Sequence, residues 1–173
     1  MTKRVLLIGA RAAGKSTVAA TLGFDWVDMD TVVRQRLGFK STAEAFTAAG
    51  EPAWRAAEGD VLAALLSDGP PVIAAGGGVG CDTRTGEMIA AARDEGQLLV
   101  IWLRTSTEEA QRRLEHGAGD RPALTAVGDA ALEAAQVMAV RAPFYEVLAD
   151  AVINADGLPE QVTAAVRQCI ADG

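Results

Sequence analysis

The sequence predicts a three-layer α/β/α fold built around a five-stranded parallel sheet. Five short apolar runs alternate with stretches of helical periodicity, and this alternation is typical of strands joined by crossover helices. Most of the runs contain no polar residue, as expected for strands that are buried on both faces. At 173 residues, the chain has the length of one domain. We therefore expect residues 1–173 to form a single unit.

The predicted strands and helices follow one another along the whole chain. The strands are expected at residues 5–8, 26–27, 72–75, 98–103 and 151–153. The helices are expected at residues 14–22, 31–67 and 82–93, after Thr105 or Ser106 as N-cap, and at 129–148 and 159–170. Gly38 and Gly50-Glu51-Pro52 punctuate the second helical region, and Arg141-Ala142-Pro143 interrupts the region at 129–148.

A phosphate-binding loop follows the first predicted strand directly. Residues 9–17 fit the pattern G-x-x-x-x-G-K-[ST], in which successive backbone N–H groups form an anion-binding nest at the start of a helix. Lys15 can reach the β- and γ-phosphates of a nucleotide, and the Ser16 hydroxyl is placed to bind Mg²⁺. The nucleotide-binding residues expected here are Gly9, Ala10, Arg11, Ala12, Ala13, Gly14, Lys15, Ser16 and Thr17. The alternative is an ordinary strand–turn–helix with a chance Gly-Lys pair.

Charge and hydropathy argue against several classes of protein. With 16 Lys+Arg against 23 Asp+Glu, the net charge is −7, which disfavours a nucleic-acid-binding or acidic-membrane-binding surface. No segment reaches the roughly 20 apolar residues that span a membrane. Cys81 and Cys169 have no metal-like spacing, and we expect free, reduced thiols. We expect a monomeric, cytoplasmic protein that binds neither nucleic acid nor membranes.

Acidic residues and glycines follow the second and third predicted strands. Asp28 and Asp30 stand two residues apart, so on a strand both carboxylates would face one site. One could support Mg²⁺ while the other holds or deprotonates an acceptor hydroxyl, although an Asp at a strand end can also simply cap the next helix. The run Gly76-Gly77-Gly78 is either a flexible turn or a place where a ligand approaches the backbone closely.

Arginines supply the remaining candidate site residues. Arg55, Arg121 and Arg141 have the side chain suited to bidentate recognition of carboxylates and phosphates, although a lone arginine is usually solvated surface. Glycines flank Arg121, and we expect a mobile lid over about residues 115–127. The three tryptophans are expected to be packing residues: Trp26, Trp54 and Trp102.

Together these motifs resemble the shikimate kinases, which are small-molecule P-loop kinases, over nearly the whole chain. The motifs are residues 9–17, Asp28-Met29-Asp30, Gly50-Glu51-x-x-Trp54-Arg55-x-x-Glu58, Gly76-Gly77-Gly78, Asp120-Arg121-Pro122-x-Leu124-Thr125 and Arg141-Ala142-Pro143-x-Tyr145. The phosphate loop is shared by many families, whereas the other five in this order are specific. The resemblance implies a P-loop kinase fold with a mobile lid, and phosphorylation of shikimate at its 3-hydroxyl by ATP with Mg²⁺, a step of aromatic amino-acid precursor synthesis.

The resemblance also implies a role for each matching residue. Ser16 and Asp28 would support Mg²⁺, and Asp30 would bind the shikimate hydroxyls and could act as base. The shikimate site would consist of Asp30, two carboxylate-clamping arginines and a glycine wall: Arg55, Arg141, Gly76, Gly77 and Gly78. The catalytic residues would be Lys15, Asp30 and Arg121. Arg113 and the region around Pro159 would flank the adenine.

The chain departs from the family pattern in two places. Between Lys15 and Asp28 it is shorter by roughly four residues, close to one helical turn, and Trp54 stands where the family usually has Phe. Two alternative functions stay open. One is another small-molecule kinase, such as one acting on gluconate, which has no evident use for two carboxylate-clamping arginines. The other is a non-catalytic shikimate-binding regulatory module, which need not retain Lys15 and Arg121 together.

Overall fold

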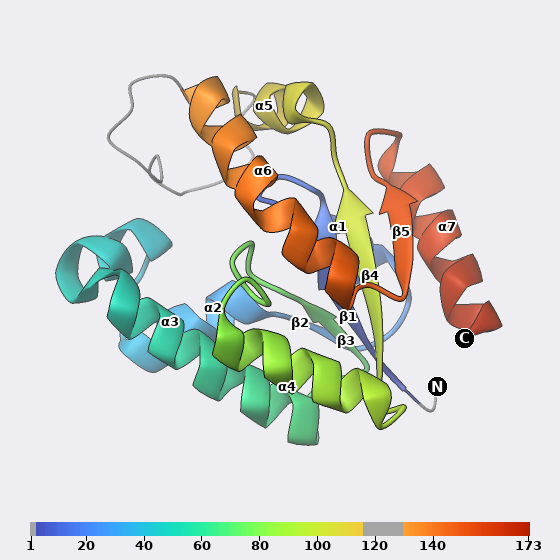
Figure 1. Cartoon of the computed structure of the whole chain (residues 1–173), viewed down its shortest axis with the longest axis horizontal. Coiled ribbons are helices and arrows are strands. Elements are labelled where there is room, and N and C mark those ends of the chain that lie inside the picture. Colours follow the sequence, from blue (N-terminus) through green and yellow to red (C-terminus); the bar gives the residue numbers. More distant parts are fainter. Residues whose placement is uncertain (1–2, 116–129) are drawn as a thin grey trace.

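A parallel five-stranded sheet forms the centre of the molecule (Figure 1). The structure is a computed structural model that describes the backbone of residues 3–115 and 130–173 and the side chains of 3–115 and 136–173. The strand order is β2-β3-β1-β4-β5, and all neighbouring strands are parallel. The strands are β1 (Arg4–Ile8), β2 (Trp26–Asp28), β3 (Val72–Ala74), β4 (Leu98–Arg104) and β5 (Ala151–Asn154).

Helices cover both faces of this sheet, so the predicted three-layer architecture is confirmed. The helices are α1 (Lys15–Thr21), α2 (Met29–Leu37), α3 (Thr42–Asp68), α4 (Thr83–Asp94), α5 (Thr107–Glu115), α6 (Ala130–Leu148) and α7 (Pro159–Asp172). Helices α2, α3, α4 and α6 lie over one face and α1 and α7 over the other (Figure 1).

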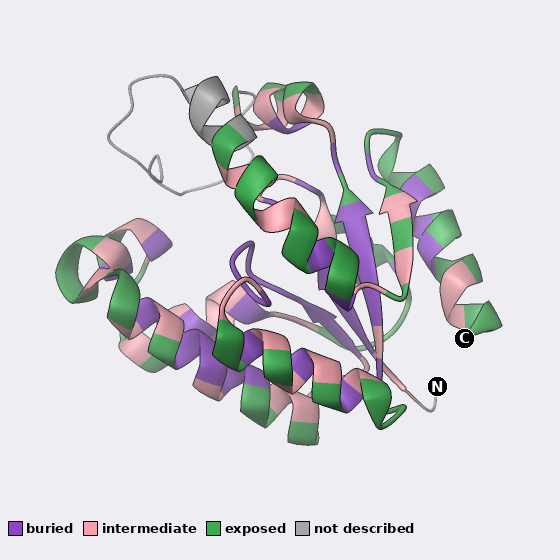
Figure 2. Cartoon of the chain, in the orientation of Figure 1, coloured by how far each residue is buried: buried purple, intermediate pink, exposed green. Residues whose placement is uncertain are grey.

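The alternation of side chains along each strand feeds two separate apolar cores. In β1, Leu6 and Ile8 belong to the core beneath α2, α3, α4 and α6, whereas Val5 and Leu7 belong to the core beneath α1 and α7. The central strands are buried on both faces, as Figure 2 shows, while the edge strands β2 and β5 are partly exposed. Trp26, on edge strand β2, is 37% exposed. The expectation that all three tryptophans pack inside is therefore wrong for Trp26, because no further strand covers it.

Two local predictions are corrected by the structure. Asp28 ends β2, but Asp30 lies in the first turn of α2 and not on a strand. The helix begins at Met29, two residues before the predicted start at residue 31, because the Asp28 side chain caps it. Helix α6 also runs without interruption through Pro143. Burial of Tyr145 and Leu148 against the sheet outweighs the backbone hydrogen bond that the proline removes.

The short first helix is supported from outside. Helix α1 has seven residues, and its last carbonyl groups would lack intrahelical partners. The Arg167 guanidinium of α7 donates to the carbonyl groups of Thr21 and Leu22, and the hydroxyls of Thr21 and Thr163 hydrogen-bond at 2.8 Å. Helix α7 thus supports the C-terminal end of the short helix α1.

Other expectations concern thiols, membranes and helix breaks. Both cysteines are free, as expected. Within the described residues, no helix has the length and apolarity needed to cross a membrane. Gly38 ends α2 with φ of 77°, and Gly50, with φ of 81°, kinks α3, so both predicted breaks are confirmed.

Candidate active site

The carboxyl edge of the sheet opens into a cleft of about 990 Å³. Parallel strands deliver their following loops to this edge, which is where open α/β sheets bind ligands. The cleft is lined by the phosphate loop, by the carboxylates of Asp28 and Asp30, by α5, and by the segment between β5 and α7. Residues 11–17, Asp28, Asp30 and Arg113 are sequence-predicted site residues that line this cleft. The other described site residues are not among its lining: Gly9, Ala10, Arg55, Gly76, Gly77, Gly78 and Arg141.

The phosphate loop has the backbone that its glycines predict. Gly9 and Gly14 have φ of 139° and 84°, and a Cβ atom on Gly9 would lie 2.5 Å from the Leu103 carbonyl oxygen. Ala12 also adopts a left-handed φ, of 63°, which is uncommon for a residue with a side chain. The Lys15 ammonium donates to the carbonyl oxygens of Gly9 and Ala10, at 2.8 and 2.7 Å. The lysine therefore lies folded over its own loop.

Asp28 connects the phosphate loop to the second strand. Its Oδ2 accepts a hydrogen bond from the Ser16 hydroxyl at 2.5 Å, and its Oδ1 accepts from the Thr31 backbone N–H at 3.2 Å. Asp28 thus caps α2, as expected for an aspartate at the end of a strand, and it also presents an oxygen beside the loop hydroxyl. This pair of oxygens is the part of the cleft suited to a hard cation.

The three glycines after β3 make room for charged side chains. A Cβ atom on Gly76 would lie 2.5 Å from Asp30 Oδ1 and 2.8 Å from Glu58 Oε1. On Gly78 it would lie 2.6 Å from Arg55 Cζ. These glycines therefore let carboxylates and a guanidinium approach the backbone, which is a more specific role than that of a flexible turn.

Gly77 lies between the phosphate loop and the second arginine. Its ideal Cβ position is 3.4 Å from the Arg11 backbone nitrogen and 3.5 Å from Arg141 Nη1. The Gly77 carbonyl accepts hydrogen bonds from Arg141 Nη1, at 2.8 Å, and from the Tyr145 hydroxyl. Residues far apart in the sequence thus meet within a few ångströms of the loop.

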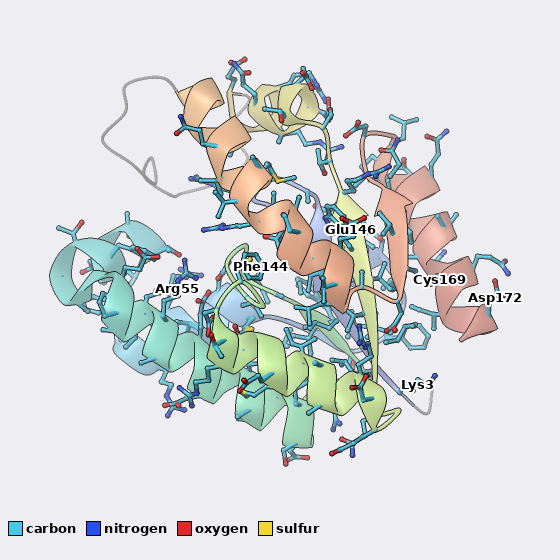
Figure 3. The ribbon with its side chains drawn as sticks, in the orientation of Figure 1. Lys3, Arg55, Phe144, Glu146, Cys169 and Asp172 are labelled. Atoms are coloured by element: carbon cyan, nitrogen blue, oxygen red, sulfur yellow. The ribbon has the colours of Figure 1, made fainter. Side chains whose placement is uncertain are left out.

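Arg55, labelled in Figure 3, leaves α3 and is held by two carboxylates of the same helix. Its guanidinium contacts Glu58 at 2.5 Å and Glu51 at 3.0 Å. Burial by itself would lower the pKa of Arg55, but the charges and hydrogen bonds of Glu58 and Glu51 outweigh it and raise that pKa. The Glu58 side chain is 2% exposed, so the arginine is positioned by a carboxylate inside the protein.

Tyr145 and Cys81 lie next to each other beside Arg141. Burial raises the pKa of the Tyr145 hydroxyl well above its ordinary value, and burial likewise raises the pKa of the Cys81 thiol. The Tyr145 ring packs on Trp102, with ring centroids 5.7 Å apart. Both groups stay protonated at neutral pH, so neither places a negative charge beside Arg141.

Trp54 is a packing residue beside Arg55. It is 2% exposed and packs on Phe46, with ring centroids 5.2 Å apart. The Trp54 indole therefore belongs to the apolar core on this face of the sheet. The expectation that Trp54 and Trp102 are buried is confirmed.

Arg113 lies at the other end of the cleft, where α5 meets the phosphate loop. Arg121 and the rest of the predicted lid after Glu115 lie outside the described residues. Sequence reasoning assigned no role to Glu58 or Tyr145, although both belong to quoted motifs. It also missed Glu109, whose spacing of four residues from Arg113 is the available signal.

A family model described as shikimate kinase matches residues 11–171. The chain belongs to the shikimate kinase family. A shikimate kinase of Gloeobacter violaceus is 36% identical over 172 residues, which cover 95% of this chain and 90% of that protein.

Solved structures of similar fold include a shikimate kinase and a gluconokinase. A shikimate kinase from Acinetobacter baumannii in complex with shikimate has a TM-score of 0.85 and 25% identity, covering 99% of this chain and 94% of that one. A gluconokinase from Sinorhizobium meliloti has a TM-score of 0.59 and 16% identity, covering 99% and 94%. The second likeness is one of fold alone.

Proposed function

We propose that this chain transfers the γ-phosphoryl group of ATP to the 3-hydroxyl group of shikimate. One observation carries the proposal: Arg55, Arg141 and Asp30 converge on the glycine stretch that lies against the phosphate loop. Two guanidinium groups suit a carboxylate, and one aspartate suits hydroxyl groups. Shikimate carries both kinds of group on one small ring.

Each residue has a proposed part in the transfer. Arg55 and Arg141 bind the carboxylate and so fix the ring against Gly76, Gly77 and Gly78. Asp30 accepts a hydrogen bond from the acceptor hydroxyl and orients its oxygen toward the γ-phosphorus. Lys15 leaves the carbonyl groups of its loop and binds the phosphates, where it stabilises the charge that develops during transfer. Arg121 is proposed to supply a second positive charge.

The nucleotide is proposed to lie along the phosphate loop toward α5. The loop backbone binds the phosphates, and Arg113 with the segment before Pro159 flanks the adenine. Both substrate sites are built from one chain, so we propose that the enzyme acts as a monomer. Its cytoplasmic location remains part of this proposal.

Ser16 and Asp28 are the residues that would hold Mg²⁺. Their oxygen atoms lie 2.5 Å apart beside Lys15, and hydroxyl and carboxylate oxygens are ligands that this ion accepts. Within residues 3–115 and 136–173, no three His, Cys, Asp or Glu side chains are grouped to hold a metal. Mg²⁺ suits such a sparse site because it keeps waters and phosphate oxygens as ligands. When bound, it would neutralise charge on the ATP phosphates.

A coupled ADP-release assay tests the proposal. ATP and MgCl₂ are supplied with shikimate, with gluconate, or with no acceptor, and the phosphorylated product is identified by mass and NMR. We expect ADP release only in the reaction that contains shikimate, and we expect its product to carry the phosphate on the 3-oxygen. Turnover with gluconate would favour the other small-molecule kinase, whereas shikimate binding with no ADP release would favour the regulatory module.

A further inference from the structure

Arg113 joins three segments of the chain at the nucleotide end of the cleft. From α5, its Nη1 donates to the Ala12 carbonyl of the phosphate loop at 3.1 Å, and its Nη2 donates to the Ala155 carbonyl at 2.6 Å. Its Nε donates to Glu109 Oε1 at 2.7 Å. Ala12 and Ala155 both line the cleft, and they lie 101 and 42 residues from Arg113 in the sequence. The guanidinium therefore connects the phosphate loop with the segment that follows β5.

Glu109 is the carboxylate that holds this guanidinium. Besides Arg113, it accepts two hydrogen bonds from Arg112, both at 2.7 Å. Its side chain is 16% exposed, against 61% for Arg112 and 20% for Arg113. The hydrogen bonds of Arg112, followed by those of Arg113, lower the pKa of Glu109 from 4.5 to about 2. The carboxylate is thus charged at neutral pH.

We propose that Glu109 is a positioning residue of the nucleotide site and acts through Arg113. It fixes the guanidinium so that the phosphate loop and the segment after β5 stay at a set separation, and a nucleotide enters a cleft that is already formed. An arginine ordered in advance loses little freedom when the nucleotide binds, so less binding energy is spent on ordering. This inference rests on the proposed function only in taking the ligand to be an adenine nucleotide.

A simple surface ion pair would behave differently. Glu109 is spaced three and four residues from the two arginines on α5. Exposed ion pairs with this spacing contribute little to the measured stability of a protein. Such a pair would not need the contacts from Arg113 to two distant backbone carbonyls. Those contacts connect the carboxylate to the cleft, and they predict an effect on nucleotide affinity that a surface pair would not have.

The test is calorimetric titration of ADP against a set of variants in the absence of shikimate. E109A should weaken ADP binding by about tenfold, which is roughly the loss expected when one charge-assisted hydrogen bond is removed. E109Q keeps one acceptor oxygen for Arg113 and should lie between E109A and wild type. E108A is the matched control, since Glu108 is the exposed acidic neighbour in the same first turn of α5. Its ADP affinity should stay within about twofold of wild type.

A double-mutant cycle with R113A separates positioning from general destabilisation. If Glu109 acts through Arg113, adding E109A to R113A should change ADP affinity by less than about twofold. The KM for shikimate should also stay within about twofold of wild type in E109A. Wild-type ADP affinity in E109A, or additive losses in the cycle, would overturn the proposal. Normal ADP binding by the wild-type chain without turnover of shikimate would instead contradict the proposed function alone.

Discussion

Replacing Gly78 by alanine should disable the acceptor site through Arg55. Gly78 does not have a left-handed φ, so alanine fits its backbone conformation. The new Cβ would meet Arg55 Nη1 most closely and would lie 2.6 Å from Cζ and 2.8 Å from Nη2, distances too short for non-bonded heavy atoms. The obstacle is the end of a flexible side chain, so the fold should survive while the guanidinium moves away from the glycine stretch.

The expected loss follows from the bonds that Arg55 would no longer make. A charge-assisted hydrogen bond to a carboxylate is worth about 1.5–3 kcal/mol, which corresponds to about tenfold to 150-fold in affinity. Gly78→Ala should therefore raise the KM for shikimate by about tenfold or more, with the KM for ATP within about twofold of wild type. Steady-state kinetics with each substrate varied in turn measure both values.

A cycle with Arg55→Ala distinguishes displacement of the arginine from direct obstruction of the ligand. If the alanine methyl acts by moving Arg55, the double variant should bind shikimate no more weakly than Arg55→Ala, within about twofold. Gly86→Ala serves as control, because a Cβ there meets only the Gly80 carbonyl oxygen, at 3.5 Å. A wild-type KM in Gly78→Ala, or additive losses in the cycle, would refute the reasoning.

Three further predictions concern other parts of the site. Lys15→Ala should lower kcat by about 10³-fold or more with the fold retained, because the lysine offsets charge in the transition state. Steady-state kinetics measure kcat, and circular dichroism checks the fold. A variant that kept half of the wild-type kcat would exclude this role for Lys15. Tyr145→Phe should lower the free energy of unfolding by about 1 kcal/mol, measured by urea denaturation, since the Gly77 carbonyl loses one of the two hydrogen bonds that it accepts from Arg141 and Tyr145. The Glu109 carboxyl should stay ionised from neutral pH down toward its pKa of about 2. Its stabilising contacts should therefore persist above pH 4.5 and be lost only as the pH falls toward 2. A carbon NMR titration of Glu109 with a midpoint near 4.5 would contradict this.

The parts of the fold that follow a regular pattern of apolar residues and glycines could be predicted from the sequence. The five strands, the phosphate loop and the ends of most helices follow from apolar runs and glycine positions, because burial on both faces of a parallel sheet leaves few other solutions. The glycine stretch was predicted as a place of close approach, but not that Asp30, Glu58 and Arg55 are what approaches it. Such contacts depend on side-chain placement between segments that are remote in sequence.

The errors have specific physical causes. Asp30 was placed on a strand because alternation alone cannot show where a strand gives way to a helix, and the cap by Asp28 decides that point. The break predicted at Pro143 does not occur, because tertiary packing of Tyr145 outweighs a local preference. Glu109 was overlooked because a carboxylate next to arginines is common on helices. Only its indirect connection to the phosphate loop distinguishes it.

The most direct test of the proposed acceptor site is shikimate binding by Arg55→Ala and Arg141→Ala. Shikimate and ATP are titrated separately against each variant, followed by steady-state kinetics. If the two arginines clamp the carboxylate, each change should weaken shikimate binding by about tenfold to a few hundredfold while ATP affinity stays near wild type. A wild-type KM for shikimate in both variants would contradict the acceptor site, even if the phosphate loop proved to bind ATP.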